Sequence, residues 1–231
     1  MIKKDVQAYA ISKWGSYLDS VSELSKNNQD ISLVESSIKL YNFDSVCNSI
    51  FKPNIKPTST DGLNFSSGTI ELIEFKSGFK QRITKYNFNP EEGKCPHKGQ
   101  VCEDYWDLFF KNQELKIDQL ISSISFKAIE SFITLEKMVF PLCQDVVTPI
   151  SIKLVVVIDE DVIDSIEDTY AELAGNTDNE NTVAKNNPLS KIRSALRRLK
   201  NLHDANNNAY LYDCIEVLSV QDYLNKLNQM A

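Results

Sequence analysis

Histidine is scarce in this sequence, which contains only His97 and His203 among 231 residues. Catalysis built on a histidine base is therefore not expected. The chain also lacks a glycine-rich phosphate loop and the GxSxG motif that carries the serine nucleophile of α/β-hydrolases. These absences argue against a P-loop nucleotide-binding protein and against a serine hydrolase.

Long apolar runs are missing as well. The longest of them, such as residues 154–158, are far shorter than the roughly 20 residues that span a bilayer. The N-terminal residues are charged and then amphipathic, without the apolar core of a signal peptide. Five cysteines make an odd count and lie mostly in apolar segments, which suits a reducing compartment better than a disulfide framework. The sequence thus predicts a soluble, cytoplasmic protein that does not enter a membrane.

Composition and charge fit a globular protein. Apolar residues make up 42% of the chain and charged residues 25%, as in folded domains. We expect one compact domain, in which a helical segment over residues 1–50 packs on an α/β core over residues 51–231. The net charge of −7 argues against a dedicated nucleic-acid coat protein. An enzyme that acts on nucleic acid needs only a local basic surface.

Hydrophobic periodicity predicts a mixture of helices and strands. Helical spacing marks residues 5–26 and, with a break, residues 32–50, where Ser32 and Glu35 form a capping-box pattern. The further predicted elements are strands at 61–66, 69–76, 150–158 and 210–218, helices at about 103–140, 188–202 and 220–227, and loops at 52–60, 87–99 and within the acidic segment 159–187. This order favours an α/β fold whose central mixed sheet is flanked by helices.

The strands at 61–66 and 69–76 form a predicted hairpin joined by a two-residue turn. In that register Asp61 faces Glu74, and strand alternation places Lys76 on the same face. Directly opposed side chains have Cβ atoms about 5 Å apart, and two carboxylates placed there repel each other unless a cation lies between them. Oxygen ligands at this separation suit a divalent cation such as Mg²⁺ or Mn²⁺. The hairpin therefore predicts a metal site.

Asp61 and the strand segment Ile73–Lys76 (IEFK) resemble the core of the PD-(D/E)XK nuclease superfamily. The resemblance covers about residues 30–160, including a helix before the hairpin and a helix and a strand after it. The sequence departs from the family pattern at Thr60, where a proline is common. The motif is short, so its weight comes from the agreement between the hairpin register and the order of the elements.

The resemblance implies a restriction-endonuclease-like fold and a nuclease that depends on Mg²⁺ or Mn²⁺. By analogy, Asp61, Glu74 and the backbone carbonyl of Phe75 would hold the cation, and Lys76 would position the attacking water. Some members of the family also place a glutamate on the first core helix, and Glu35 is the matching candidate here.

A polar stripe runs along the helix predicted at 103–140. Its members are Lys116, Gln119, Ser123, Lys127 and Glu130. Such a stripe is usually the solvent-exposed face of a helix. In the family that the hairpin resembles, a lysine or glutamine of this helix often approaches the active site, and Gln119 is the candidate favoured for that role.

Basic residues crowd the helix predicted at 188–202. They are Lys191, Arg193, Arg197, Arg198 and Lys200, with His203 just beyond. Either they form a solvated face that balances the acidic segment before them, or they contact the phosphates of DNA or RNA. The sequence leaves both interpretations open.

Cys95, His97 and Cys102 place three potential zinc ligands close together. A structural zinc site needs four ligands, and no fourth is evident nearby in the sequence. We therefore expect an ordinary loop here rather than a zinc site.

Two hypotheses of function follow. The first is metal-dependent hydrolysis of phosphodiester bonds in DNA or RNA through Asp61, Glu74 and Lys76. The second is a catalytically inactive nuclease fold that serves as a binding or assembly module in a defence, mobile-element or phage setting. The acidic net charge and the lack of an obvious DNA-binding appendage motivate the second. Both leave a protein partner and a homo-oligomer open.

Overall fold

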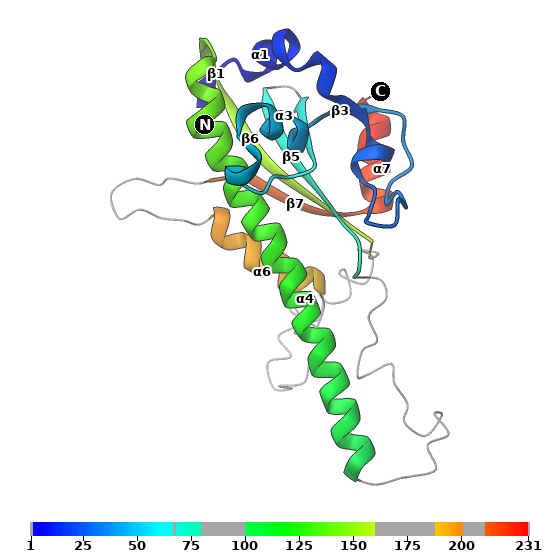
Figure 1. The fold of residues 1–231 in the computed structure, drawn as a ribbon. Helices are drawn as coiled ribbons and strands as arrows, with labels where there is room; N and C mark the ends of the chain where they lie inside the picture. The colour runs from blue at the N-terminus through cyan, green and yellow to red at the C-terminus, as the bar shows by residue number, and fades with distance from the viewer. Residues whose placement is uncertain (1, 67, 80–99, 160–187, 201–210, 231) are drawn as a thin grey trace, which may run out of the picture.

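The computed structural model describes residues 2–66, 68–79, 100–159, 188–200 and 211–230. These residues form a mixed seven-stranded sheet with helices on both of its faces (Figure 1). The α/β fold with a mixed central sheet is therefore confirmed. Within the described ranges, no helix combines the length and the apolar character needed to cross a membrane.

The sheet combines antiparallel and parallel pairs, and β1 pairs antiparallel with β6. Its strand order is β2, β3, β4, β5, β6, and both β1 and β7 pair with the far side of β6. Neighbours from β2 to β5 are antiparallel, whereas β5, β6 and β7 are parallel. The strands are β1 (Ile2–Lys4), β2 (Leu18–Ser20), β3 (Lys39–Asn42), β4 (Gly62–Ser66), β5 (Thr69–Lys76), β6 (Asp145–Ile158) and β7 (Cys214–Ser219).

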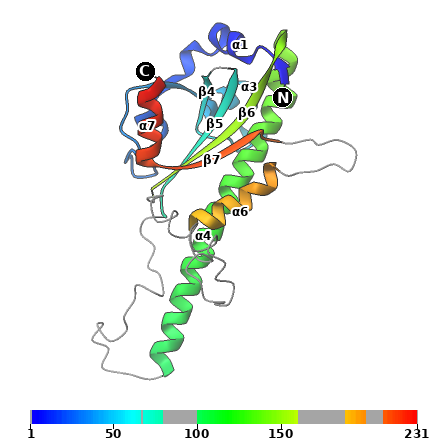
Figure 2. The same cartoon turned by 180° about the vertical axis from the view of Figure 1, so that it is seen from behind.

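The longest helix, α4, connects β5 to the parallel strand β6 and crosses one face of the sheet (Figure 1). The helices are α1 (Val6–Lys13), α2 (Val21–Leu24), α3 (Phe43–Ile50), α4 (Gln100–Thr134), α6 (Pro188–Lys200) and α7 (Val220–Met230). Short 3-10 turns lie at Gly15–Tyr17, Pro53–Ile55 and Phe140–Leu142, and a π-helical turn at Leu135–Val139 follows α4. Figure 2 shows α7 from the opposite side.

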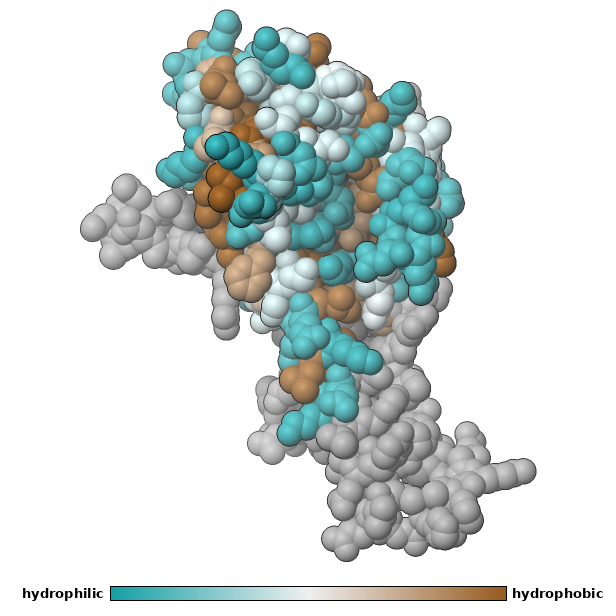
Figure 3. Space-filling view, in the orientation of Figure 1, coloured by the Kyte–Doolittle hydropathy of each residue, from teal (hydrophilic) through white to brown (hydrophobic). Residues whose placement is uncertain are grey.

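Strand β6 forms the spine of two hydrophobic layers. The run Leu154–Ile158 is completely buried, as its unbroken apolar character predicts for a strand in the middle of a parallel sheet. Leu154 and Val156 belong to the hydrophobic layer that also contains residues of α1, α3, α4 and α6, whereas Val155 and Val157 belong to the layer that contains residues of α2 and α7. Hydrophilic side chains cover much of the described face in Figure 3, with smaller apolar areas between them.

The N-terminal segment differs from its expected structure. The predicted helix at 5–26 is wrong, because α1 ends at Lys13 and the chain then turns at Gly15 and extends as β2. Pairing of β2 with β3 and the burial of Trp14 against Tyr41 outweigh the helical spacing. Residues 1–50 thus add three strands to the sheet as well as helices.

The capping-box helix expected at Ser32 and Glu35 is also wrong. Ser25 Oγ accepts a hydrogen bond from the Val34 N–H at 3.0 Å, and Ser22 Oγ accepts one from the Ser36 N–H at 2.8 Å. These serine side chains give the backbone partners other than those of a helix. The next helix is α3, which begins at Phe43. The Asn42 side chain caps it by accepting a hydrogen bond from the Ser45 N–H.

The remaining predicted elements agree with the structure. The hairpin, the long helix, the buried strand, the helix at 188–202 and the final strand and helix are all confirmed, with boundaries that shift by a few residues. The loop expected at 87–99 and residues 160–187 of the acidic segment lie outside the described residues.

Two valines of β6 test how much the buried layer contributes to stability. Val156 is completely buried, whereas Val147 on the same strand is 92% exposed. We expect Val156→Ala to lower the free energy of unfolding by about 2–3 kcal/mol, because it removes two buried methyl groups and leaves a cavity. Val147→Ala should change it by less than about 0.5 kcal/mol. Urea denaturation measures both, and equal losses would contradict the assignment of β6 as the spine.

Candidate functional site

The hairpin register follows the prediction. Leu63 pairs with Leu72, and the ladder between β4 and β5 ends at the pair Gly62 and Ile73. Asp61 lies one residue beyond the ladder, where its Oδ2 accepts a hydrogen bond of 2.8 Å from the Phe75 N–H. This side-chain bond, rather than a strand pair, holds Asp61 beside the end of β5.

The chain that leads into Asp61 is anchored to two helices. Asp44 of α3 lies 2.7 Å from the Lys56 ammonium and accepts a hydrogen bond of 2.8 Å from the Ser59 hydroxyl. The Thr60 N–H donates to Ser131 Oγ of α4 at 2.8 Å. The segment before β4 is therefore fixed at several points, which restricts where the Asp61 carboxylate can lie.

Lys127 of α4 lies between the two predicted carboxylates. Its ammonium nitrogen is 3.0 Å from Asp61 Oδ1, and 2.9 and 3.0 Å from the two carboxylate oxygens of Glu74. The Glu74 side chain is completely buried, whereas those of Asp61 and Lys127 are about one quarter exposed, at 23% and 24%. The cation that the opposed carboxylates require is thus supplied by a lysine of the chain.

The electrostatics of this trio are strongly coupled. Burial, followed by the neighbouring Asp61 charge, raises the pKa of Glu74 above its ordinary value. Burial acts against the charge on Lys127, but the two carboxylates outweigh it and raise the pKa of Lys127. Lys127 therefore stays protonated and is the group that makes a buried Glu74 carboxylate tolerable.

Lys76 lies on the predicted face, next to this trio. Its ammonium nitrogen is 4.0 Å from Glu74 Oε1 and donates a hydrogen bond of 3.2 Å to Ser123 Oγ on α4. The described part of the site thus contains Asp61, Glu74 and Lys76 as expected, with Ser123 and Lys127 added from the helix.

The stripe on α4 faces the hairpin along much of its length. Ser123 and Lys127 contact the site, and the Glu130 carboxylate accepts hydrogen bonds from the N–H and the hydroxyl of Thr58. The interpretation of this stripe as a simple solvent-exposed face is therefore wrong for these three residues. Their spacing by four and three residues predicts that they share one face of the helix. The positive charge of Lys127 in this stripe could have identified it as the partner of the two carboxylates.

Two predicted residues are not brought to the site. Gln119 is exposed, one turn of α4 before Ser123. Glu35 is exposed on the chain between α2 and β3, and its carboxylate accepts a hydrogen bond of 3.2 Å from the Ser22 hydroxyl. Its neighbour Val34 belongs to the hydrophobic layer opposite α4, which places Glu35 on the wrong side of the sheet for this role.

The predicted basic surface is described only in part. Arg193 and Arg197 are exposed on α6, whereas the side chains of Lys191, Arg198 and Lys200 and all of His203 lie outside the described residues. Cys95, His97 and the side chain of Cys102 also lie outside them. No cluster of three or more His, Cys, Asp or Glu side chains suited to a metal ion occurs within the described ranges.

Comparison of the chain with known proteins finds no match. The chain matches no protein-family model, no curated protein and no solved structure. The chemistry of the site therefore rests on its own geometry.

Removing the Lys127 ammonium should destabilise the fold. We expect Lys127→Met to lower the free energy of unfolding by about 3 kcal/mol, because it leaves a buried carboxylate without its cation. Lys137→Met is the matched control, since the Lys137 side chain is 66% exposed and its loss should cost less than about 0.5 kcal/mol.

A double variant separates lost charge from lost packing. In the Lys127→Met background, Glu74→Gln should cost less than it does alone, because the neutral amide no longer needs the ammonium. Urea denaturation of the four proteins gives the coupling energy. Strict additivity of the two substitutions would contradict the ion pair.

Proposed function

We propose that the protein is a metal-dependent nuclease that hydrolyses phosphodiester bonds in DNA or RNA at Asp61, Glu74 and Lys76. The observation that carries this proposal is the meeting of all three side chains at the end of β5, under helix α4. The hairpin, the crossover helix α4 and the parallel strand β6 also follow one another as in the restriction-endonuclease-like core that the sequence resembles.

The oxygen donors at the site fit a hard divalent cation. Asp61 Oδ1 and the Glu74 carboxylate meet around one position, which the Lys127 ammonium occupies. The Phe75 N–H points toward Asp61, and the carbonyl of the same strand residue projects to the same side, past the end of β4. When bound there, Mg²⁺ or Mn²⁺ supplies Lewis-acid polarisation of a phosphate ester.

Lys127 limits how a metal enters. Two carboxylates and the ammonium groups of Lys76 and Lys127 already balance in charge, so a divalent cation has to displace Lys127 from its bridging position. The site thus fits the metal only with a changed side-chain position of Lys127. This requirement is specific to the chain and follows from the distances.

Lys76 is the residue suited to act on the nucleophile. Its ammonium is held by Ser123 and lies beside Glu74 without the short contacts that fix Lys127. From there it can orient a water and balance the charge that develops on a phosphate in the transition state. Ser123 acts through Lys76 and is a positioning residue.

A second candidate function has an observation of its own. Because Lys127 completes the charge balance without a metal, the same fold can remain stable as a catalytically inactive module that binds a protein partner. The two functions differ in whether a divalent cation can replace Lys127.

Cleavage assays test the nuclease directly. Supercoiled plasmid and single-stranded RNA are incubated with Mg²⁺ or Mn²⁺, and we expect cleavage by wild type that EDTA abolishes. Asp61→Asn and Lys76→Met should each reduce the rate at least about a hundredfold, because each removes a group that acts on the reacting phosphate or the water. Lys137→Met, at an exposed lysine of the π turn, should cleave as wild type does. Cleavage that survives both site variants would overturn the proposal.

Calorimetric titration with Mn²⁺ distinguishes the two functions. Glu74→Gln should lose metal binding, whereas Lys127→Met should bind at least about tenfold more tightly than wild type, because no ammonium competes. Added Mn²⁺ should also recover part of the stability that Lys127→Met loses. Equal and weak heats in all three proteins, together with no cleavage, would favour the inactive module.

A further inference from the structure

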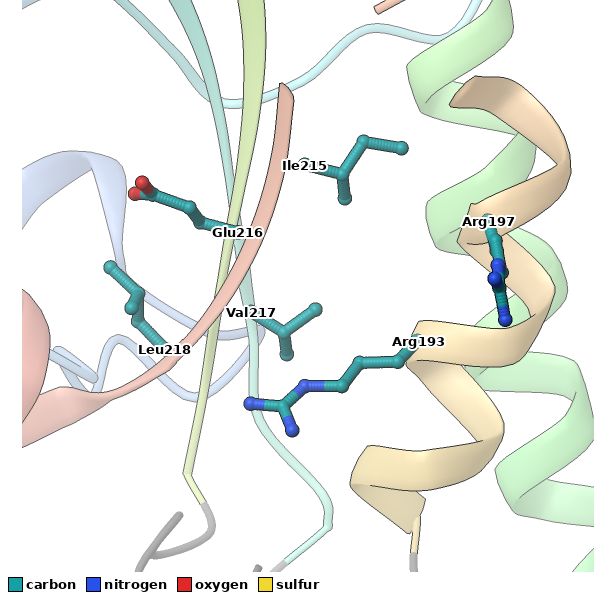
Figure 4. A pocket seen from close by; sticks show the side chains of 6 residues that line it. All are labelled: Arg193, Arg197, Ile215, Glu216, Val217 and Leu218. Carbon is teal, nitrogen blue, oxygen red and sulfur yellow. The ribbon is translucent and has the colours of Figure 1, made fainter. Parts of the chain in front are cut away.

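A groove of about 440 Å³ lies between helix α6 and strand β7 (Figure 4). Its walls are Arg193 and Arg197 of α6 and four consecutive residues of β7, Ile215, Glu216, Val217 and Leu218. Successive strand residues point to opposite faces of a sheet, so a groove lined by all four lies along the edge of β7 rather than over one face. Figure 4 shows Ile215 and Val217 directed toward α6, and Glu216 and Leu218 directed away from it.

The outer edge of β7 carries backbone groups that its ladder leaves open. Among the described strands, β7 pairs only with β6. The Ser151 N–H donates to the Gly68 carbonyl on the β5 side of β6, whereas the Ile152 carbonyl accepts from the Asp213 N–H on the β7 side. The backbone N–H and C=O groups of the even-numbered residues of β6 therefore point toward β7. With Leu154 opposite Ile215, the ladder bonds then fall on the residues that flank Ile215.

It follows that the N–H and C=O groups of Ile215 and Val217 point outward, into the groove. An edge strand with open backbone groups is a template for one more strand. The same two residues direct their apolar side chains toward α6, so an added strand would find both hydrogen-bonding groups and an apolar wall. Many peptide-binding domains recognise an extended segment in this way.

The arginines indicate the charge of that segment. Both are exposed, and the structure gives neither guanidinium an ion-pair partner among the described residues. Among the described residues that line the groove, Glu216 is the only carboxylate, and it is already engaged by Lys153 and Lys226. The groove therefore presents two free positive charges on the α6 side.

The spacing of these charges matches a strand. Arg193 and Arg197 are four residues apart on a helix, which separates them by about 6 Å along its axis. Alternate residues of a strand are separated by about 6.6 Å and point to the same face. Two acidic side chains at positions i and i+2 of an added strand would thus meet one guanidinium each, as charge-assisted pairs.

We propose that the groove between α6 and β7 binds an extended peptide of a partner protein, which adds a strand to β7 and places alternate acidic side chains against Arg193 and Arg197. The open backbone edge and the apolar wall favour a peptide over the nucleic-acid phosphates that the basic helix alone suggested. None of the described residues that line the groove belongs to the carboxylate cluster, and the proposal does not depend on nuclease activity.

Fluorescence anisotropy tests the proposal on the full-length protein. The probe is a fluorescein-labelled peptide of about eight residues, a usual strand length, in which glutamate alternates with valine. We expect saturable binding that weakens at least about tenfold in Arg193→Gln/Arg197→Gln and with a probe that carries glutamine in place of glutamate. Lys137→Gln, an exposed cation elsewhere, is the matched control and should leave binding unchanged.

Amide hydrogen exchange followed by NMR tests the strand itself. The peptide should slow exchange of the Ile215 and Val217 N–H groups, whereas the Glu216 N–H, which faces β6, should change little. Absence of peptide binding, or binding that is insensitive to both arginines, would overturn the proposal. A single-stranded oligonucleotide that binds through the arginines without protecting Ile215 and Val217, while the peptide does not bind, would also overturn it and return α6 to phosphate contact.

Discussion

Three parts of the chain that are distant in sequence meet at the ammonium of Lys127. Asp61 comes from the end of an anchored loop, Glu74 from the central strand β5, and Lys127 from the crossover helix α4. A completely buried carboxylate is costly unless a cation and hydrogen bonds compensate it. The position of α4 on the sheet is therefore tied to the charge of Glu74. Any ligand that binds the carboxylates has to act on this same interaction.

The opposite face of β5 also carries a buried glutamate that is compensated by lysines. Glu71 is also buried, and Lys226 of α7 lies 2.6 Å from its carboxylate, with Lys153 of β6 at 3.9 Å. Each face of the central strand thus carries one buried glutamate, and each glutamate is held by a lysine from the helix that covers that face. The pairing fixes which helix packs on which side of the sheet, in addition to the apolar contacts.

Local patterns made the hairpin and the face of its charged residues predictable. A two-residue turn and strict alternation determine the register, so Asp61, Glu74 and Lys76 could be placed together from sequence, with Glu71 on the other face. The partner from α4 could not be chosen in the same way. Ser123, Lys127 and Gln119 share one stripe, and which of them reaches the strand depends on how far the helix slides along the sheet, a tertiary property that periodicity does not contain.

The N-terminal errors have a related cause. Helical spacing at 5–26 and the Ser32 and Glu35 pattern are local signals, whereas β2 and β3 form because they extend an existing sheet and bury Trp14. A short strand has little local signature, and its stability comes from the neighbour with which it pairs. The sheet edge that β2 forms is therefore visible only once the position of β4 is known.

The two buried glutamates differ in their surroundings, which is why the proposed chemistry is placed at Glu74 and not at Glu71. Glu71 lies in the middle of β5, opposite Asn64 on one side and Lys153 on the other, so strand ladders occupy the backbone around it. At Glu74 the β4 ladder has ended, and Asp61 folds back over the open backbone of Phe75. Oxygen donors from a carboxylate, a second carboxylate and a main-chain carbonyl can converge only at such a ladder end. The chemistry proposed for this face thus depends on where β4 stops, and on whether a metal can replace the Lys127 ammonium that lies there.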